Sequence, residues 1–146
     1  LFRAIMIQQI DRLSPSASLQ SEGGPLALEA GLRSYANQML AVSLEGDVLG
    51  VNRLIYSESH RFPELGAAAA ERTALGIARI SDFVRTCARN AGRSCSDPKG
   101  IAEAFIFMIR GWDVNVLLTN REVPVAERER WVKRAVRALV CGQHEW

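Results

Sequence analysis

The sequence predicts an all-α domain of six helices, and three observations carry that prediction. Apolar residues recur at intervals of three and four along most of the chain, which is the period of an amphipathic helix. Proline and glycine steps separate these periodic segments and supply helix starts and stops. No stretch alternates apolar and polar residues with strand-forming side chains, as a half-buried strand would require.

Composition places the chain among ordinary globular proteins. Its 146 residues are enough for one domain with a substantial core, and short for two. Hydrophobic residues make up 48% and charged residues 23%, and the net charge of +2 gives no overall electrostatic case for binding nucleic acid. Three cysteines cannot all pair within one chain, so reduced thiols and a cytoplasmic location are expected.

The longest apolar stretch, residues 104–118, does not predict a membrane span. Arg110, Asp113 and Asn115 interrupt it before it reaches the roughly 20 apolar residues that a bilayer requires. No signal peptide is expected, since the chain opens at Leu1 in the middle of a helical pattern. That opening indicates that residues are missing upstream.

The first part of the chain is predicted to form three helices. One runs through about Leu13, and a breaker-rich connection leads to a second over about residues 25–44. Gly46 and Asp47 close the second helix, and Asp47 is expected to cap the third. The expected inward positions are Leu28, Leu32, Tyr35, Ala36 and Met39 on the second helix, and Val48, Val51, Ile55 and Ser59 on the third.

A Phe-Pro step sets the corner between the third and fourth helices. Pro63 lacks an N–H and disfavours helical geometry at Phe62, so the third helix should end near His60 or Arg61. Proline suits a first helical turn, so the fourth helix should begin at Pro63 with Glu64 near its positive end. Two helices therefore meet at a fixed corner, with Phe62 as a wedge beneath it.

Three further helices follow, over about residues 63–91, 98–119 and 124–140. Gly92 ends the first of these, and Asp97 with Pro98 caps the next. The inward stripe of the helix over 63–91 is expected to hold Leu65, Ala69, Gly76, Ile77, Ile80, Phe83, Val84, Cys87 and Ala91. Its other faces are expected to hold Arg72, Arg79, Asp82, Arg85 and Arg89.

The joint at residues 53–66 carries a family resemblance. It reads Arg-Leu-Ile-Tyr-Ser-Glu-Ser-His-Arg-Phe-Pro-Glu-Leu-Gly, and its corner consists of Arg61, Phe62, Pro63, Glu64 and Leu65. The joint resembles that of the AefR-like subgroup of TetR-type transcriptional repressors, in which an Arg-Phe-Pro-Glu-Leu corner joins the sixth and seventh helices. The order and lengths of the surrounding helices agree as well.

The resemblance implies an assignment for nearly the whole chain. The six helices would correspond to the fourth through ninth of a TetR-type protein, so that residues 1–146 form its C-terminal ligand-binding and dimerisation domain. Residues 1–13 would be the helix that connects this domain to the DNA-binding domain. The helix-turn-helix that reads operator DNA is absent from the sequence.

The helix over 98–119 is apolar on nearly every side, so it must be covered on several sides. Ile101, Phe105, Met108, Trp112 and Val116 would face its own core. A second strip could also be intramolecular core, yet six helices leave few elements to cover it. The preferred interpretation, which the resemblance also implies, is a two-fold homodimer whose last two helices form a four-helix bundle. The expected interface residues are Phe107, Gly111, Val114, Leu118, Trp131, Val132, Val136 and Leu139.

An interior pocket for a small-molecule effector is the second expected site. Large aromatic side chains, adaptable methionines and a few hydroxyls suit an apolar pocket, although the same residue types favour plain core packing. The resemblance favours the pocket, because TetR-type domains hold their effector between these helices. The expected lining residues are Tyr35, Met39, Ile55, Ser59, Phe83, Phe105, Met108 and Trp112.

Catalytic and metal chemistry find little support in the sequence. Ser57 and His60 lie close along the chain, but neighbouring residues on a helix point in different directions. His60 and Glu64 have the spacing of a metal pair, but Pro63 separates them and no third ligand appears. Neither a metal nor another cofactor is therefore expected, and a redox role for Cys95 lacks a partner thiol.

The expected function is effector sensing by a TetR-type repressor. A small apolar effector would set the tilt of residues 1–13, and so the spacing of two DNA-binding heads against half-sites about 34–36 Å apart. Operator DNA would be contacted only through the N-terminal domain. Two alternatives stay open: a helical adaptor that binds another protein through its apolar strip, and a small helical enzyme.

Overall fold

The computed structural model describes Ala4 and residues 25–146. Residues 25–146 form five α-helices and one short 3-10 helix, and they contain no strand, so the described part of the chain is all-α as predicted. The helix expected through Leu13 lies outside the described residues, apart from Ala4. The elements are α2 (Pro25–Leu44), α3 (Gly46–Glu58), α4 (Pro63–Asn90), α5 (Pro98–Thr119), α6 (Val125–Cys141) and η1 (Gln143–Glu145).

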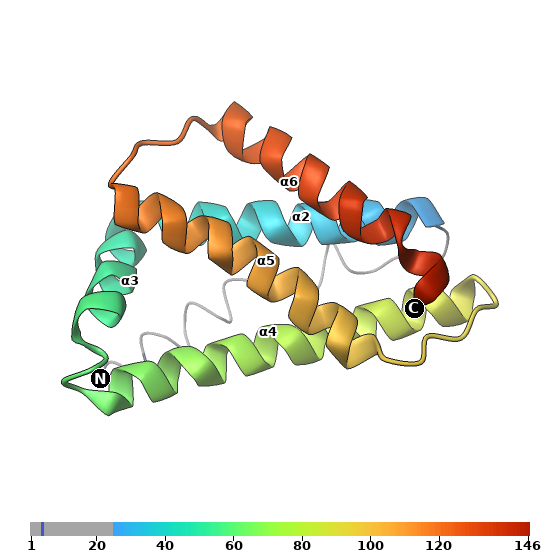
Figure 1. Ribbon diagram of the computed structural model, residues 1–146, viewed down its shortest axis with the longest axis horizontal. Coiled ribbons are helices and arrows are strands. Elements are labelled where there is room, and N and C mark those ends of the chain that lie inside the picture. The colour runs from blue at the N-terminus through green and yellow to red at the C-terminus, as the bar shows by residue number, and fades with distance from the viewer. Residues whose placement is uncertain (1–3, 5–24) are drawn as a thin grey trace.

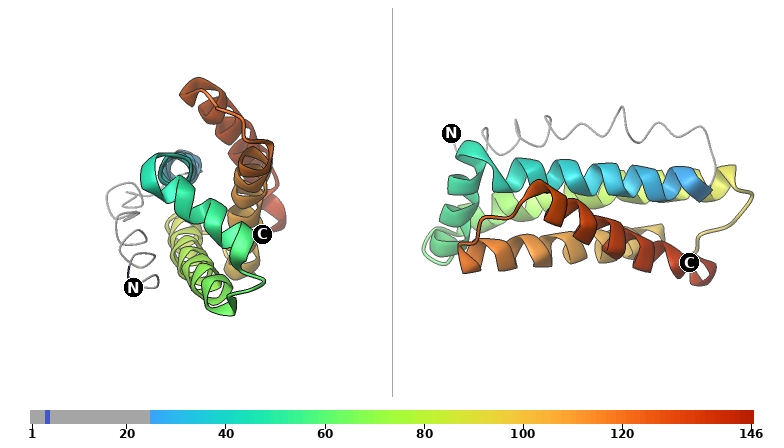
Figure 2. Two further views of the ribbon diagram at one scale, coloured as in Figure 1. Left: turned by 90° about the vertical axis from the view of Figure 1, so that its left-hand side faces the viewer. Right: turned by 90° about the horizontal axis from the view of Figure 1, so that it is seen from above.

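The helices form two layers. Helices α2 and α4 lie on one side, and α5 and α6 lie on the other (Figures 1 and 2). The closest pairings across the layers are α5 on α4 and α6 on α2. The short α3 crosses one end of the molecule and bridges α2 to α4 (Figure 2). Each long helix therefore buries one face against the opposite layer.

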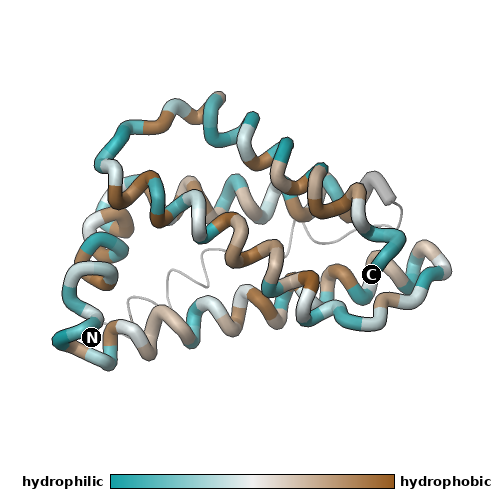
Figure 3. The backbone as a smooth tube through the Cα atoms, in the orientation of Figure 1, coloured by the Kyte–Doolittle hydropathy of each residue, from teal (hydrophilic) through white to brown (hydrophobic). Residues whose placement is uncertain are grey.

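The core lies between these layers and draws on four helices. Figure 3 shows hydrophobic residues recurring along α5, which crosses the middle of the molecule. Full burial of one aliphatic or phenylalanine side chain contributes about 1.5–3 kcal/mol to the stability of the fold. The largest fully buried apolar side chains are Leu32 and Leu40 on α2, Ile80 and Val84 on α4, Phe105, Ile106 and Ile109 on α5, and Val132 and Val136 on α6.

Close approach of α2 and α4 depends on a glycine. A Cβ atom added at Gly31 would collide with the ring of Phe83, which is 4% exposed. Phe83 thus fills the space that a side chain at Gly31 would need. The absence of a side chain at Gly31 therefore allows α2 and α4 to pack closely at this contact.

Most helix ends lie where the sequence predicts them. The N-cap of α5 is Asp97, whose Oδ1 accepts a hydrogen bond from the backbone N–H of Gly100 at 2.9 Å, and Pro98 opens the helix. Helix α4 begins at Pro63, and Gly92 follows its end with a φ of +66°. These predictions are confirmed because the local signals, a capping carboxylate, a proline and a left-handed glycine, act without tertiary help.

The predicted cap of α3 is wrong. Its N-cap is Glu45, with an extended backbone and no side-chain hydrogen bond, while Asp47 lies within the first turn. Gly46 has a φ of +60°, which a side chain would disfavour, and this residue makes the sharp break after α2. Asp47 retains a favourable position near the positive end of the α3 dipole.

The predicted wedge at the corner is also wrong. Helix α3 ends at Glu58, close to the expected stop, but the Phe62 side chain is 43% exposed. The guanidinium of Arg61 lies 5.4 Å from the centre of the Phe62 ring, at the surface. Leu65, which is 8% exposed, occupies the inward position instead.

Candidate functional site

A small cavity lies where α2, α4 and α5 meet. Its volume of about 20 Å³ leaves room for about one water molecule. Tyr35 and Met39, two of the residues expected to line an effector pocket, lie in its wall on α2. The described residues that line it are Tyr35, Met39, Val42 and Ser43 from α2, Arg72, Thr73, Gly76 and Arg79 from α4, and Ile106 and Arg110 from α5.

The Tyr35 side chain contacts several parts of the site, including Gly76 on α4 and Phe105 on α5. A Cβ atom added at Gly76 would lie 3.1 Å from the Tyr35 hydroxyl oxygen, so glycine there keeps room for the hydroxyl. The Tyr35 and Phe105 rings pack with their centres 6.2 Å apart. Burial raises the pKa of Tyr35 against the opposing effect of Arg79 and Arg110, so the hydroxyl keeps its proton and can donate a hydrogen bond.

Arg72 is buried beside the cavity, although the sequence analysis placed it on an outer face of α4. Its Nη2 donates to Oδ1 of Asn52 at 3.3 Å, and Nδ2 of Asn52 donates to the Ser43 carbonyl at 3.1 Å. Asn52, itself 2% exposed, thereby links α2, α3 and α4. Burial, and then the charge of Arg110, lower the pKa of Arg72 to about 10, so the guanidinium stays charged at neutral pH.

Asp113 is the acidic partner of this cluster. It is 2% exposed, and burial raises its pKa to about 6 against the opposing attraction of Arg110 and Arg72. Within the described part of the chain, Oδ1 of Asp113 and the Nε atoms of Arg72 and Arg110 have no hydrogen-bond partner. Buried polar atoms are usually paired, so these three mark a site with unused hydrogen-bonding capacity.

A second feature is an apolar strip on the outer side of α5, called the α5 strip, formed by Phe107, Gly111, Val114 and Leu118. Phe107 is 56% exposed and Leu118 is 75% exposed, and Val114 is half-buried. Nothing lies within 4 Å of a Cβ atom placed at Gly111. The four residues follow helical spacing, so they share one face along α5.

A family comparison decides the class of this protein. Residues 30–142 match the family of the AefR-like transcriptional repressor, C-terminal domain, which is a TetR-type domain. The chain belongs to this AefR-like family. Neither the curated proteins nor the solved structures contain a match to it. Membership assigns the AefR-like domain to transcriptional regulation and makes it a regulatory rather than a catalytic domain.

The AefR-like domain brings together only part of the residue set expected for the pocket. Phe83 and Phe105 belong to the core beside the cavity wall, and Met108 and Trp112 are half-buried against that core. The Trp112 ring stacks on Trp131, with ring centres 4.9 Å apart. Of the eight residues expected to line the pocket, Tyr35 and Met39 line this cavity, whereas Phe83, Phe105, Met108 and Trp112 pack in or against the core.

Two expected pocket residues on α3 lie away from the cavity. Ile55 is buried with Ala68 in a separate small cluster, and Ser59 is half-buried beside Gly66 at the corner. The reason is the position of α3 across one end of the layers, where it meets the start of α4. Neither residue lines the cavity.

The α6 residues expected at the dimer interface divide into two groups. Val132 and Val136 are fully buried in the core of the single chain, so they are corrected from interface to core. Their burial follows from the packing of α6 on α2. Trp131 and Leu139 are half-buried at the edge of that core.

The sequence analysis missed Arg72, Asn52, Arg110 and Asp113. A signal for Arg72 was present, because it falls four residues from both Ala68 and Gly76, which are buried on the same stripe. Arg110 and Asp113 interrupt an otherwise apolar helix, and they were treated only as arguments against a membrane span. Charges inside an apolar helix are costly unless they are paired or functional.

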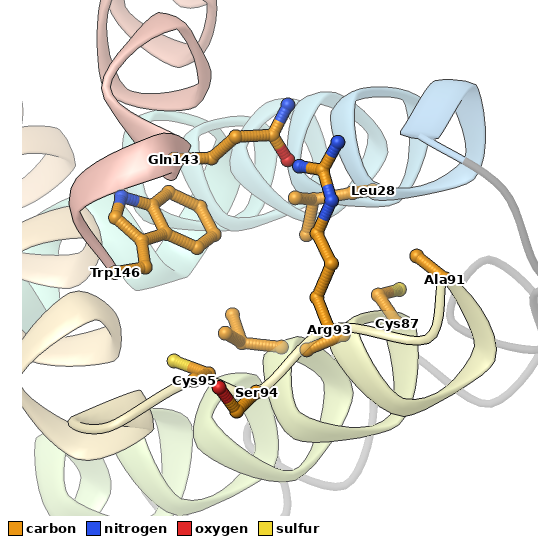
Figure 4. Close-up of a pocket in the computed structure, with 10 residues that line it drawn as sticks. Leu28, Cys87, Ala91, Arg93, Ser94, Cys95, Gln143 and Trp146 are labelled. Atoms are coloured by element: carbon orange, nitrogen blue, oxygen red, sulfur yellow. The ribbon is translucent and has the colours of Figure 1, made fainter.

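Two other hollows lie elsewhere in the AefR-like domain. One, of about 30 Å³, lies beside the C-terminal turn, where Arg93 extends toward Gln143 and where Cys87 and Cys95 lie on one wall (Figure 4). The other, of about 550 Å³, is an open gap beneath the α5–α6 connection. In that gap Nη2 of Arg53 donates to Oδ1 of Asn120 at 2.6 Å, and Arg128 pairs with Glu45 at 3.2 Å.

The residues considered for catalysis or metal binding have ordinary surroundings. The Ser57 hydroxyl donates to the Leu54 carbonyl at 3.2 Å, and His60 is exposed. Among the described residues, no group of three His, Cys, Asp or Glu side chains is arranged to hold a metal ion. No helix in residues 25–146 combines the length and the apolar content needed to cross a bilayer.

Proposed function

We propose that the AefR-like domain binds a small-molecule effector and pairs with a second copy of itself, as the sensor of a TetR-type repressor. The observation that carries the pairing is the α5 strip. Phe107 and Leu118 are large apolar side chains that remain mostly exposed in the single chain. Exposed apolar residues aligned on one face of a helix are typical of an interaction surface.

The α5 strip suits a helix–helix contact with its own copy. Its residues are spaced by four, three and four along α5, which is the spacing of a packing seam between helices. Gly111 adds no side chain at the middle of the strip, so a second α5 could approach closely there. Around a two-fold axis, α5 and α6 of both copies would form a four-helix bundle flanked by Trp131 and Leu139.

The cavity among α2, α4 and α5 is the proposed effector site. It has room for only about one water molecule, so an effector would have to move these helices apart in order to enter. Met39 is a flexible side chain that can yield to a ligand. An effector that prefers the wider arrangement would shift the domain toward it, and would move the helix proposed for residues 1–13 and the DNA-binding heads with it.

The test of this proposal uses the chain joined, upstream of Leu1, to a helix-turn-helix DNA-binding domain. We expect sequence-specific binding to an operator with two half-sites, and a change in operator affinity when an effector from a screen is added. Met39→Trp should keep operator binding but abolish the effector response, because the larger ring fills the cavity. Leu75→Trp, at an exposed position of α4, is the matched control and should preserve both. Absence of sequence-specific DNA binding would contradict the proposal.

A further inference from the structure

We propose that the effector is an amphipathic organic carboxylate, whose carboxylate group binds Arg72 and Arg110 in the cavity among α2, α4 and α5. This inference rests on the proposed function, because it names the chemical class of the effector for that cavity. The sequence alone favoured an apolar effector. The residues that the fold brings to the cavity favour one with a charged end.

The cavity wall carries an excess of positive charge. Arg72 and Arg110 both line it, and none of the described lining residues is acidic. The nearby Asp113 offers one carboxyl group to Arg72 and Arg110. Even with Asp113 ionised, the two positive charges of Arg72 and Arg110 face one negative charge. An entering anion would offset this excess, whereas an organic cation would be repelled.

The two arginines have donors to spare. Arg72 is 8% exposed and donates to the neutral amide of Asn52, while its Nε is buried without a partner in the part of the chain that the structure describes. The Nε of Arg110 is also buried without a partner among the described residues. A guanidinium presents parallel N–H groups that match the two oxygens of a carboxylate. A neutral ligand would leave these donors unmatched.

The rest of the wall accounts for the apolar part of the effector. Met39, Val42 and Ile106 line the cavity together with the ring of Tyr35. These side chains offer contact area to a hydrocarbon or aromatic body, and the Tyr35 hydroxyl can add one hydrogen bond. Binding sites of this kind combine an apolar wall with a few placed polar groups.

The binding test compares probes that differ only in their charged end. The first set contains straight-chain carboxylates of four to twelve carbons, together with benzoate. The matched amides, primary amines and phosphate monoesters form the other sets. We expect one or more carboxylates to bind the 146-residue chain in isothermal titration calorimetry. Affinity should fall by about 10-fold or more for the matched amide, because the charged hydrogen bonds are lost.

Two variants of Arg110 and one control test the contribution of Arg110 to carboxylate binding. Arg110→Gln should lower carboxylate affinity by about 10-fold or more, and Arg110→Lys should give a smaller loss, because lysine keeps the charge but not the paired donors. Arg85→Gln removes an exposed arginine of α4 that pairs with Asp82, and it should leave affinity within about two-fold. Circular dichroism of each variant checks that the helices remain folded.

A measurement on the unmodified chain covers the case in which an arginine variant fails to fold. The ¹H–¹⁵N resonances of the Arg72 and Arg110 Nε–H groups should shift when the carboxylate is added, while that of Arg85 should not. Tighter binding of the amide, the amine or the phosphate ester would overturn the carboxylate inference and leave the cavity as a sensor of another ligand class. Failure of all four sets to bind at millimolar concentration would overturn the inference and the proposed effector site together.

Discussion

Asp113 on α5 is a buried carboxyl group that titrates closer to neutral pH than an ordinary aspartate. Two effects act on its pKa in opposite directions. Burial disfavours the charged form while Arg110 and Arg72 favour it, and burial has the larger effect. At pH 7 the group is mostly ionised and its Oδ1 has no hydrogen-bond partner among the described residues. The ionised carboxylate therefore reduces stability while it balances part of the arginine charge.

The raised pKa of Asp113 predicts that the free energy of unfolding depends on pH. The folded-state pKa of Asp113 is about 6, above its unfolded value of 3.8, so the folded chain binds more protons between these two pH values. The Asp113 contribution to stability is therefore fully present below about pH 4 and is lost as the pH rises through 6. This rise in pKa from 3.8 to about 6 corresponds to about 3 kcal/mol.

The comparison of Asp113→Asn with the unmodified chain isolates that contribution. Urea unfolding between pH 4 and pH 7.5 should show the variant gaining relative stability as the pH rises, by up to about 3 kcal/mol, because asparagine carries no charge at either end of the range. Asn115→Ala, on the exposed side of α5, serves as the control and should show a pH-independent difference. A constant difference for Asp113→Asn as well would contradict the assigned pKa.

The sequence predicted some residues of the site and failed to predict others. Tyr35 and Met39 were predicted because large apolar residues on the inward stripe of a helix reach the interior. Arg72 was not, because a charged residue is expected outside, although its spacing placed it on the buried stripe of α4. The long apolar stem of arginine allows that burial when the head group finds a partner such as Asn52.

Among the helices, α5 shows most directly how one segment can serve two surfaces. Phe105, Ile106 and Ile109 face the core and are fully buried, while the α5 strip on its other side is open to solvent. The sequence predicted two strips from their helical spacing, but it placed the half-buried Met108 and Trp112 on the core strip and did not include Ile106 and Ile109. It did not predict the burial of Val132 and Val136, because periodicity gives the inward face of α6 but not which helix covers it.

The α5 strip predicts the effect of a charge placed on it. Phe107→Glu should weaken the proposed dimer by about 100-fold or more. In a two-fold dimer the substitution occurs in both copies, so it removes two buried phenylalanines, each worth about 1.5–3 kcal/mol, and places two negative charges near each other. Leu75→Glu, at a position on α4 that is 41% exposed, is the matched control and should leave association unchanged. Size-exclusion chromatography over a dilution series measures both. Equal elution of Phe107→Glu and the unmodified chain would exclude the strip as the interface.

For the molecule as a whole, the two-layer arrangement explains where the cavity lies. Helices α2 and α4 share one layer and α5 crosses them from the other, so their side chains converge where the three helices meet. The position of α3 at one end removes Ile55 and Ser59 from that convergence. Helix order, caps and breaks could be predicted from local signals, whereas this placement depends on tertiary packing that periodicity does not specify.

The arrangement also places the proposed functions of α5 on two adjacent faces of the helix. The cavity receives Ile106 and Arg110, while Phe107 and Gly111, each one residue further along, lie on the α5 strip. A ligand that displaces α5 from α4 would therefore move the strip as well. In the proposed dimer, effector binding and the relative orientation of the two copies would be coupled through this one helix.

The proposed two-fold pairing is tested most directly by the mass of the unmodified 146-residue chain in sedimentation equilibrium at micromolar concentration. The result expected is a single species of twice the monomer mass, because the α5 strip of each copy would be covered by the other. A chain that stays monomeric across that range would contradict the pairing, since Phe107 and Leu118 would then remain exposed to water without a second copy.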